Sequence, residues 1–354
     1  MINNIIIQEY YNFFILFFSS ASFSFFFIKF FPIIKNHIYH SNGPQKIHTG
    51  DVSRLGGLSI FLSFCVMLFY QETFQIKITE YLICFLPVFL IGLVEDITQR
   101  VKPTIRLMSA FISSVIFIYI TDITINRLGF YIGDLFLNYK PLSMVFTILC
   151  IAYLTQAFNI IDGLNGLSLC TSIICLLSLA IISENNFNYL IFQQSLNLIF
   201  ILLGVLLFNF FGKIFIGDSG AYLIGFIIAT IAINLSVNNH YLSPFVIVLI
   251  LFYPSWELLR TILRRFLNKK NIFSPDAKHL HSLLYSNNLK RFKFSNFKTN
   301  LFTSLQIIFF QLVIFIFVIS FYRNENLLIL GIAISISFYE LIYKIEKNYL
   351  NKQA

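Results

Sequence analysis

The segment 156–167, QAFNIIDGLNGL, carries one carboxylate and two amides at three-residue intervals between two long apolar runs. These side chains are Asn159, Asp162 and Asn165, and two glycines keep the nearby main chain open to a ligand. Carboxylate and amide oxygens are hard ligands of the kind that Mg²⁺ takes, and amide edges can pair with a base or a sugar. The same residue types also form ordinary interhelical turns. The segment is therefore either a binding site or a turn.

Acidic residues also stand where other apolar runs end or begin. Glu95 and Asp96 end one run, where the negative end of a helix dipole disfavours an anion unless a cation joins it. A metal or basic partner is expected there, although surface ion pairs would give the same pattern. Asp218 and Ser219 begin a helix in the segment FIGDSGAYLIG. The free N–H groups of this helix predict an anion site, with a simple N-cap as the alternative.

Basic residues and histidines fall close to the same helix ends. Lys46 and Arg54 precede a diglycine, which suits a phosphate and equally a plain positive loop. Arg106 follows the acidic pair, and His279 and His281 follow a run of arginines. Histidines at i and i+2 do not share a helix face, which argues against a zinc pair on one helix. Contacts with phosphate oxygens are expected, with binding of anionic lipid headgroups as the alternative.

The composition shows what kind of scaffold must hold these groups. Of the 354 residues, 57% are hydrophobic and 12% are charged, and the mean hydropathy is +0.78. These values exclude a soluble domain and predict an all-α, polytopic integral membrane bundle. The net charge of +9 does not indicate nucleic acid, because membrane proteins carry Lys and Arg in cytoplasmic loops. The five cysteines lie inside apolar runs without metal-ligand spacing, which predicts buried thiols and no disulfides.

Near-continuous apolar runs predict about eleven membrane spans, with ten as an alternative because the second run is short. The runs are 10–31, 56–70, 78–95, 105–121, 141–159, 164–182, 190–209, 219–236, 243–260, 300–321 and 326–343. Residues 1–10 lack the basic start of a signal peptide, so the first run is expected to remain as a helix.

This arrangement collects 21 of the 25 Lys and Arg residues on one side of the membrane. The bias predicts that this side is cytoplasmic, with the N-terminus outside and the C-terminus inside. We expect a single transmembrane domain, 1–354, in which the cytoplasmic loops form the active site. These loops are 32–55, 96–104, 160–163, 210–218 and 261–299.

The order of these motifs resembles the polyprenyl-phosphate N-acetylhexosamine-1-phosphate transferase family, glycosyltransferase family 4. The resemblance covers nearly the whole chain, through KIH…RLGG, GLVED, NIIDGLNGL, FIGDSG and HLHS. It implies a Mg²⁺-dependent enzyme, with Mn²⁺ as a substitute, that transfers a sugar 1-phosphate from a UDP-N-acetylhexosamine to undecaprenyl phosphate and releases UMP. The implied setting is the bacterial inner membrane, with the site facing the cytoplasm, membrane lipid around the chain and a homodimer as one option.

The resemblance also implies a role for each matched residue. It makes Asp218 and Asn159 the Mg²⁺ ligands, Asn165 the uracil contact and Arg106 a phosphate contact. The implied catalytic residues are Asp96, Glu95, Asp162 and Asp218, and the implied substrate-binding residues are Lys46, Arg54, Arg106, Asn159, Asn165, His279 and His281. Asp96 is also a candidate to orient or to deprotonate the acceptor phosphate.

Three positions depart from the family pattern. Glu95 replaces an Asp, Ser282 replaces the last His, and Glu257 stands where an Asp is usual. The missing third histidine favours the branch that starts O-antigen, enterobacterial common antigen or capsule over the phospho-MurNAc-pentapeptide branch of peptidoglycan synthesis. A transporter or a non-catalytic scaffold is an alternative. A transporter would place its polar groups near the bilayer midplane, whereas these acids lie at helix ends.

Overall fold

The computed structural model describes residues 2–35, 52–70, 75–271 and 278–352, and the regular elements within these ranges are all α-helices. They are α1 (Ile2–Lys35), α2 (Gly56–Tyr70), α3 (Gln75–Thr98), α4 (Pro103–Thr121), α5 (Tyr131–Leu137), α6 (Lys140–Ile160), α7 (Leu167–Asn185), α8 (Tyr189–Asn209), α9 (Gly217–Asn238), α10 (Pro244–Ile250), α11 (Phe252–Leu267), α12 (Leu280–Phe292), α13 (Asn296–Phe321) and α14 (Glu325–Asn351).

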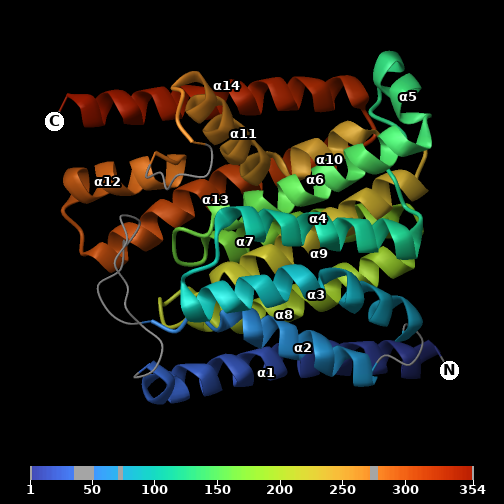
Figure 1. Cartoon of the computed structure of the whole chain (residues 1–354), viewed down its shortest axis with the longest axis horizontal. Coiled ribbons are helices and arrows are strands. Elements are labelled where there is room, and N and C mark those ends of the chain that lie inside the picture. Colours follow the sequence, from blue (N-terminus) through green and yellow to red (C-terminus); the bar gives the residue numbers. More distant parts are fainter. Residues whose placement is uncertain (1, 36–51, 71–74, 272–277, 353–354) are drawn as a thin grey trace.

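The predicted membrane bundle is confirmed. Within the described ranges, nine helices are long and apolar enough to cross a membrane, and α10 with α11 forms a tenth, bent unit. The apolar part of α2 is shorter, and it matches the short second run expected from the sequence. The long helices lie side by side, with the start of α1 and the end of α14 at opposite ends of the bundle (Figure 1). The eleven predicted crossings would place the two termini on opposite sides of the membrane, whereas ten crossings would place them on the same side.

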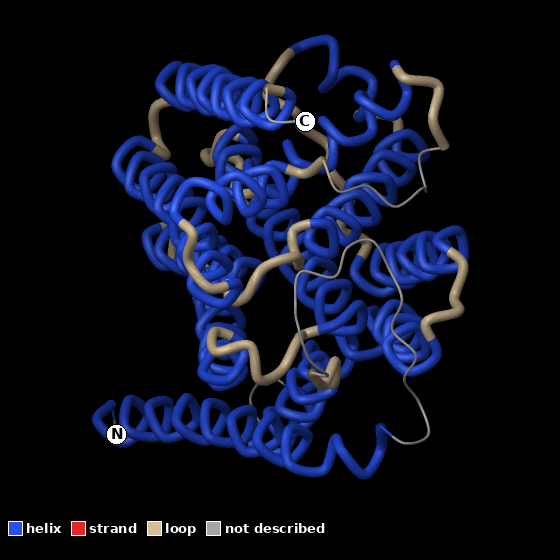
Figure 2. Tube along the Cα trace, turned by 90° about the vertical axis from the view of Figure 1, so that its left-hand side faces the viewer, coloured by secondary structure: helices blue, strands red, loops and turns tan. Residues whose placement is uncertain are grey.

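Helix α9 forms the centre of the bundle, and 89% of the residues in its most apolar stretch are buried. After its first turn it carries only apolar, small or uncharged polar residues, so it can bury all of its faces. It packs against α2, α3, α6 and α7. Figure 2 looks onto the left-hand end of Figure 1, where several loops connect helices of the bundle. The N-terminus of α9 therefore lies among the ends of its neighbouring helices.

Glycines allow the backbones around the start of α9 to approach closely. A Cβ on Gly57 of α2 would lie 2.7 Å from the Cα of Gly220, and one on Gly92 of α3 would lie 2.5 Å from the Cα of Ser219. The segment before α2 also pairs with the segment before α9: the Gly56 N–H donates to the Phe215 carbonyl at 2.9 Å. These contacts fix α2 and α3 against the beginning of α9.

The ninth predicted span, 243–260, is not straight. α10 and α11 meet at a bend of 79°. Pro254, in the first turn of α11, has no N–H to donate to the carbonyl of Ile250. The Cys175 thiol donates to that carbonyl instead, at 3.3 Å. The loss of one helical hydrogen bond therefore accounts for the break, and a thiol of α7 satisfies the freed oxygen.

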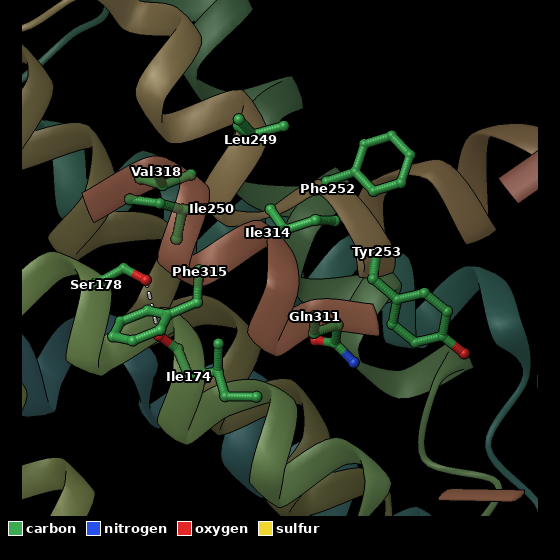
Figure 3. Close-up of a pocket in the computed structure, with 10 residues that line it drawn as sticks. All are labelled: Ile174, Ser178, Leu249, Ile250, Phe252, Tyr253, Gln311, Ile314, Phe315 and Val318. Atoms are coloured by element: carbon green, nitrogen blue, oxygen red, sulfur yellow. Dashed lines mark hydrogen bonds between the residues drawn. The ribbon is translucent and has the colours of Figure 1, made fainter. Parts of the chain in front are cut away.

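A small cavity lies beside this bend, between α7, α10, α11 and α13 (Figure 3). Its lining is mainly apolar and consists of Ile174, Ser178, Leu249, Ile250, Phe252, Tyr253, Gln311, Ile314, Phe315 and Val318. None of the candidate site residues lines it. All five cysteines carry free thiols, but only Cys84 and Cys175 are buried as expected, whereas Cys65, Cys150 and Cys170 are half-buried.

We expect Gly57→Val to destabilise the protein, because the new side chain would collide with the backbone of Gly220. Overpacking of this kind costs about 1–3 kcal/mol. The melting temperature of the purified protein in detergent measures the effect, with Ile112→Val on the exposed face of α4 as the control. Equal melting temperatures for Gly57→Val and the wild type would contradict the close contact.

Candidate active site

Asp96 anchors the end of α3 to the beginning of α9. It is 1% exposed, and its carboxylate accepts hydrogen bonds from the N–H groups of Asp218 (2.7 Å) and Ser219 (2.9 Å). The Ser219 hydroxyl donates a third, at 2.5 Å. A helix N-terminus favours an anion through its unpaired N–H groups and its dipole. The helix N-terminus thus binds an anion, as predicted, and that anion is a side chain of the protein itself.

Arg106 connects the acidic groups of α3 and α9. In the first turn of α4, it forms an ion pair with Asp218. Its guanidinium lies 3.7 Å from Oε1 of Glu95, whose Oε2 accepts the Val101 N–H at 2.8 Å. The three charged side chains keep 17–19% of their surface exposed, so solvent and ligands can reach them. Arg106 is therefore the basic partner that the sequence led us to expect beside Glu95.

Tyr222 links Asp218 to the candidate metal ligand on α6. It lies one turn after Asp218, and its hydroxyl interacts with that carboxylate. The same hydroxyl accepts a hydrogen bond from Nδ2 of Asn159 at 3.1 Å. Because the amide nitrogen of Asn159 is engaged, its Oδ1 is the atom left for a ligand. Tyr222 was not among the residues predicted from the sequence, although its spacing of four residues from Asp218 places both on one helix face.

Asp162 lies in the turn after α6, close to this cluster. Burial raises the pKa of its carboxyl from 3.8 to about 7, and the charge of Asp218 adds to the rise, whereas Arg54 opposes it. Arg54 precedes α2 and also acts electrostatically on Glu95. At neutral pH the Asp162 carboxyl can therefore both hold and release a proton. Lys46, predicted to act beside Arg54, lies outside the described residues.

Asn165 belongs to a loop whose main chain is held on both sides. Its N–H donates to Oδ1 of Asn300 at 2.8 Å, and the Ser304 hydroxyl donates to its carbonyl at 2.8 Å. Oδ1 of Asn209 accepts the N–H of Gly166, also at 2.8 Å. The side-chain Oδ1 of Asn165 is buried, and no donor among the described residues reaches it. Buried polar atoms are normally paired, so this oxygen is available to an N–H group of a ligand.

His279 and His281 stack against each other, a contact that their sequence spacing does not predict. Their ring centroids are 5.4 Å apart and their planes differ by 2°. His279 is the N-cap of α12 and has an extended backbone, so the rule for two positions within one helix does not apply to it. Nε2 of His281 would lie 2.6 Å from a Cβ on Gly163. The histidine pair therefore contacts the turn that carries Asp162.

The oxygen atoms of Asp218 and Asn159 suit a hard divalent cation, and both residues contact the Tyr222 hydroxyl. Among the described residues, no group of three or more His, Cys, Asp or Glu side chains is arranged to hold a metal. Mg²⁺ commonly binds through one or two carboxylates and takes its remaining ligands from water and substrate phosphates. The donor set thus fits Mg²⁺ better than a metal that needs a complete protein cage.

Known proteins are similar in sequence to this chain. A model of glycosyl transferase family 4 matches residues 78–236. Over 251 residues the chain is 30% identical to the probable undecaprenyl-phosphate N-acetylglucosaminyl 1-phosphate transferase of Bacillus subtilis, an overlap of 68% of this chain and 67% of the relative. The chain belongs to glycosyl transferase family 4.

Two undecaprenyl-phosphate alpha-N-acetylglucosaminyl 1-phosphate transferases are more distant relatives in this family. That of Thermotoga maritima is 28% identical over 238 residues, covering 67% of this chain and 69% of the relative. That of Salmonella typhi is 25% identical over 248 residues, covering 68% and 67%. The part that matches the family 4 model holds Glu95, Asp96, Arg106, Asn159, Asp162, Asn165 and Asp218. Arg54 and the two histidines lie outside it.

We expect the stability of this family 4 protein to fall in acid because of His281. Burial and the neighbouring His279 lower the pKa of His281 from 6.5 to about 4. The unfolded chain therefore binds this proton more tightly, so the contribution is fully present above pH 6.5 and is lost as the pH falls toward 4. Each pH unit in this window costs up to about 1.4 kcal/mol.

Melting curves in detergent at pH 7 and pH 5 test this expectation. The fall in melting temperature should be smaller in His281→Asn than in the wild type, because asparagine does not titrate. His240→Asn, at the opposite end of α9, is the matched control and should behave like the wild type. Equal falls in wild type and His281→Asn would contradict the assignment.

Proposed function

We propose that this chain transfers N-acetylglucosamine 1-phosphate from a UDP-sugar to undecaprenyl phosphate and releases UMP. The observation that carries the proposal is the joining of Asp218, Arg106, Asn159 and Asp162 at the helix ends of the segment that matches family 4. The names of the relatives support both the acceptor lipid and the sugar. The product would be the first lipid-linked sugar of a surface glycan such as O-antigen.

The reaction must bring a nucleotide diphosphate and a lipid phosphate together against their mutual repulsion. Arg106 and Arg54 supply positive charge at the cluster, and Asn165 offers a buried acceptor for the N–H of a base. Asp218 and Asn159 would hold Mg²⁺, which would neutralise phosphate charge when bound. Positioning and charge neutralisation supply most of the catalysis in phosphoryl transfer.

An oxygen of the lipid phosphate attacks the phosphorus that bears the sugar, and the bond from that phosphorus to UMP breaks. The UMP oxygen leaves with the bonding electrons. A phosphate monoester loses its second proton near pH ~6, so the nucleophile is largely ionised at neutral pH. Asp162 can take a remaining proton, since its pKa of about 7 matches the acceptor. We assign Asp96 a positioning role instead of the role of base, because α9 donates to both of its oxygens.

The membrane bundle lets the acceptor tail stay in lipid while its phosphate reaches the helix ends. In the orientation that we propose, these ends face the cytoplasm of a bacterial inner membrane. The distribution of Lys and Arg supports this orientation.

UMP release by the purified protein tests the reaction. Release should require both undecaprenyl phosphate and Mg²⁺, and UDP-N-acetylglucosamine should be the best of a panel of UDP-N-acetylhexosamines. Asp218→Asn and Asp162→Asn should each lower kcat at least about a hundredfold, because each removes a charge from the reacting cluster. Asp122→Asn, which loses an exposed ion pair with Lys140 at the far end of α4, should keep wild-type activity. Full activity of Asp218→Asn would refute the site.

Thiol labelling of intact cells tests the orientation. The two probe positions, Lys290 on α12 and Tyr241 after α9, lie toward opposite ends of the bundle and are exposed. Each is changed to cysteine in a variant whose five native cysteines are replaced by serine. An impermeant maleimide should label Tyr241→Cys and spare Lys290→Cys until the cells are opened. The reverse pattern would overturn the orientation and leave the fold intact.

A further inference from the structure

A second polar cluster lies outside the segment that matches the family model, around Glu257 of α11. Glu257 is 1% exposed, yet it has hydrogen-bonding partners on two other elements. The Tyr339 hydroxyl of α14 donates to its Oε2 at 2.6 Å. Nδ1 of His279 lies 3.1 Å from its Oε1, and the Leu280 N–H donates to the same oxygen at 3.2 Å. A carboxylate is costly to bury unless it is paired in this way.

The partners of Glu257 continue along both helices. Thr261 lies one turn later on α11, and its hydroxyl is 3.3 Å from Nδ1 of His279. Arg264, a further turn along, donates to the carbonyl of Lys278. Tyr343 on α14 donates to the same carbonyl at 3.0 Å. One face of α11 and one face of α14 together hold the chain at 278–280, just where α12 begins.

This arrangement determines which nitrogen of His279 is free. Two oxygens, from Glu257 and Thr261, flank Nδ1, and a carboxylate can only accept a hydrogen bond. The proton of a neutral ring therefore resides on Nδ1, and Nε2 is left as the acceptor toward a ligand. His279 stacks on His281, which in turn touches Gly163 beside Asp162. A continuous series of contacts therefore leads from Tyr339 of α14, through Glu257 and the two histidines, to the turn that carries Asp162.

We propose that Glu257 is a positioning residue, which fixes the tautomer of His279 and holds the histidine pair against the Asp162–Gly163 turn. The proposal rests on the proposed function, since it assumes that the pair assists transfer. Glu257 touches no reacting group and acts through His279. The same carboxylate takes over the helix capping that the His279 side chain does not provide, because it accepts the first N–H of α12.

A double-mutant cycle tests this role. Glu257→Gln keeps the shape of the side chain but can turn an NH₂ group toward Nδ1, which favours the other tautomer. We expect kcat for UMP release to fall about tenfold to a hundredfold, as for other partners that orient a histidine. In a His279→Ala background, Glu257→Gln should cause no further loss, because the residue through which it acts is gone.

Glu346→Gln is the matched control. Glu346 is another buried carboxylate at the α12–α14 interface, where it pairs with Asn287 and Arg291 of α12 (2.5 and 2.9 Å). It contacts neither histidine, so its loss should leave kcat within about twofold of the wild type. An equal loss of activity in Glu346→Gln, or an undiminished effect of Glu257→Gln without His279, would overturn the proposal.

Nitrogen-15 NMR of selectively labelled histidine supplies a readout that does not depend on activity. His279, assigned by its absence in His279→Ala, should carry its proton on Nδ1 in the wild type and on Nε2 in Glu257→Gln. A wild-type ring protonated on Nε2 would refute the proposal. Absence of lipid-dependent UMP release from the wild type would refute the proposed function alone. If Glu257→Gln does not fold, Glu257→Asp enters the same cycle, with an expected smaller loss of kcat and an unchanged tautomer.

Discussion

The hydrogen bonds from Asp96 to the beginning of α9 are the interaction on which the site depends. A carboxylate at 1% exposure would be unstable in a membrane bundle without them, and the first N–H groups of α9 would be unpaired. Each group therefore needs the other. The contact fixes the position of α3 along the axis of α9, and it therefore also fixes the position of Glu95 relative to Asp218. Arg106 can then reach both acids from α4.

Small residues make this contact possible, since Gly57 and Gly92 let α2 and α3 approach the start of α9. In lipid, close backbone approach replaces much of the packing that the hydrophobic effect drives in water. The polar cluster is thus built on a closely packed helix junction at the start of α9. Its side chains can be partly exposed to ligands while their backbones remain rigid.

The membrane spans could be predicted because a helix in lipid must be long and apolar, and both properties are visible in sequence. The helix-end acids could be found because they interrupt such runs. The partners of each acid could not be predicted in the same way, because no local sequence feature indicates that Asp96 pairs with Ser219, 123 residues later. The bend at Leu251 did carry a local signal in Pro254. The stacking of His279 on His281 did not, because it depends on Glu257 holding the first residue of α12.

The site joins residues that are far apart in the chain. Gly163, in the turn after α6, contacts His281, which follows the 79° bend between α10 and α11. This separation has a consequence for biogenesis. The ribosome delivers the acidic cluster in the first two thirds of the chain, and those helices can pack around α9 as soon as they enter the membrane. The contacts that hold His279 need Glu257 of α11 and Tyr339 of α14. Synthesis as far as α9 therefore supplies the acidic residues of the site but not the contacts that hold its histidines.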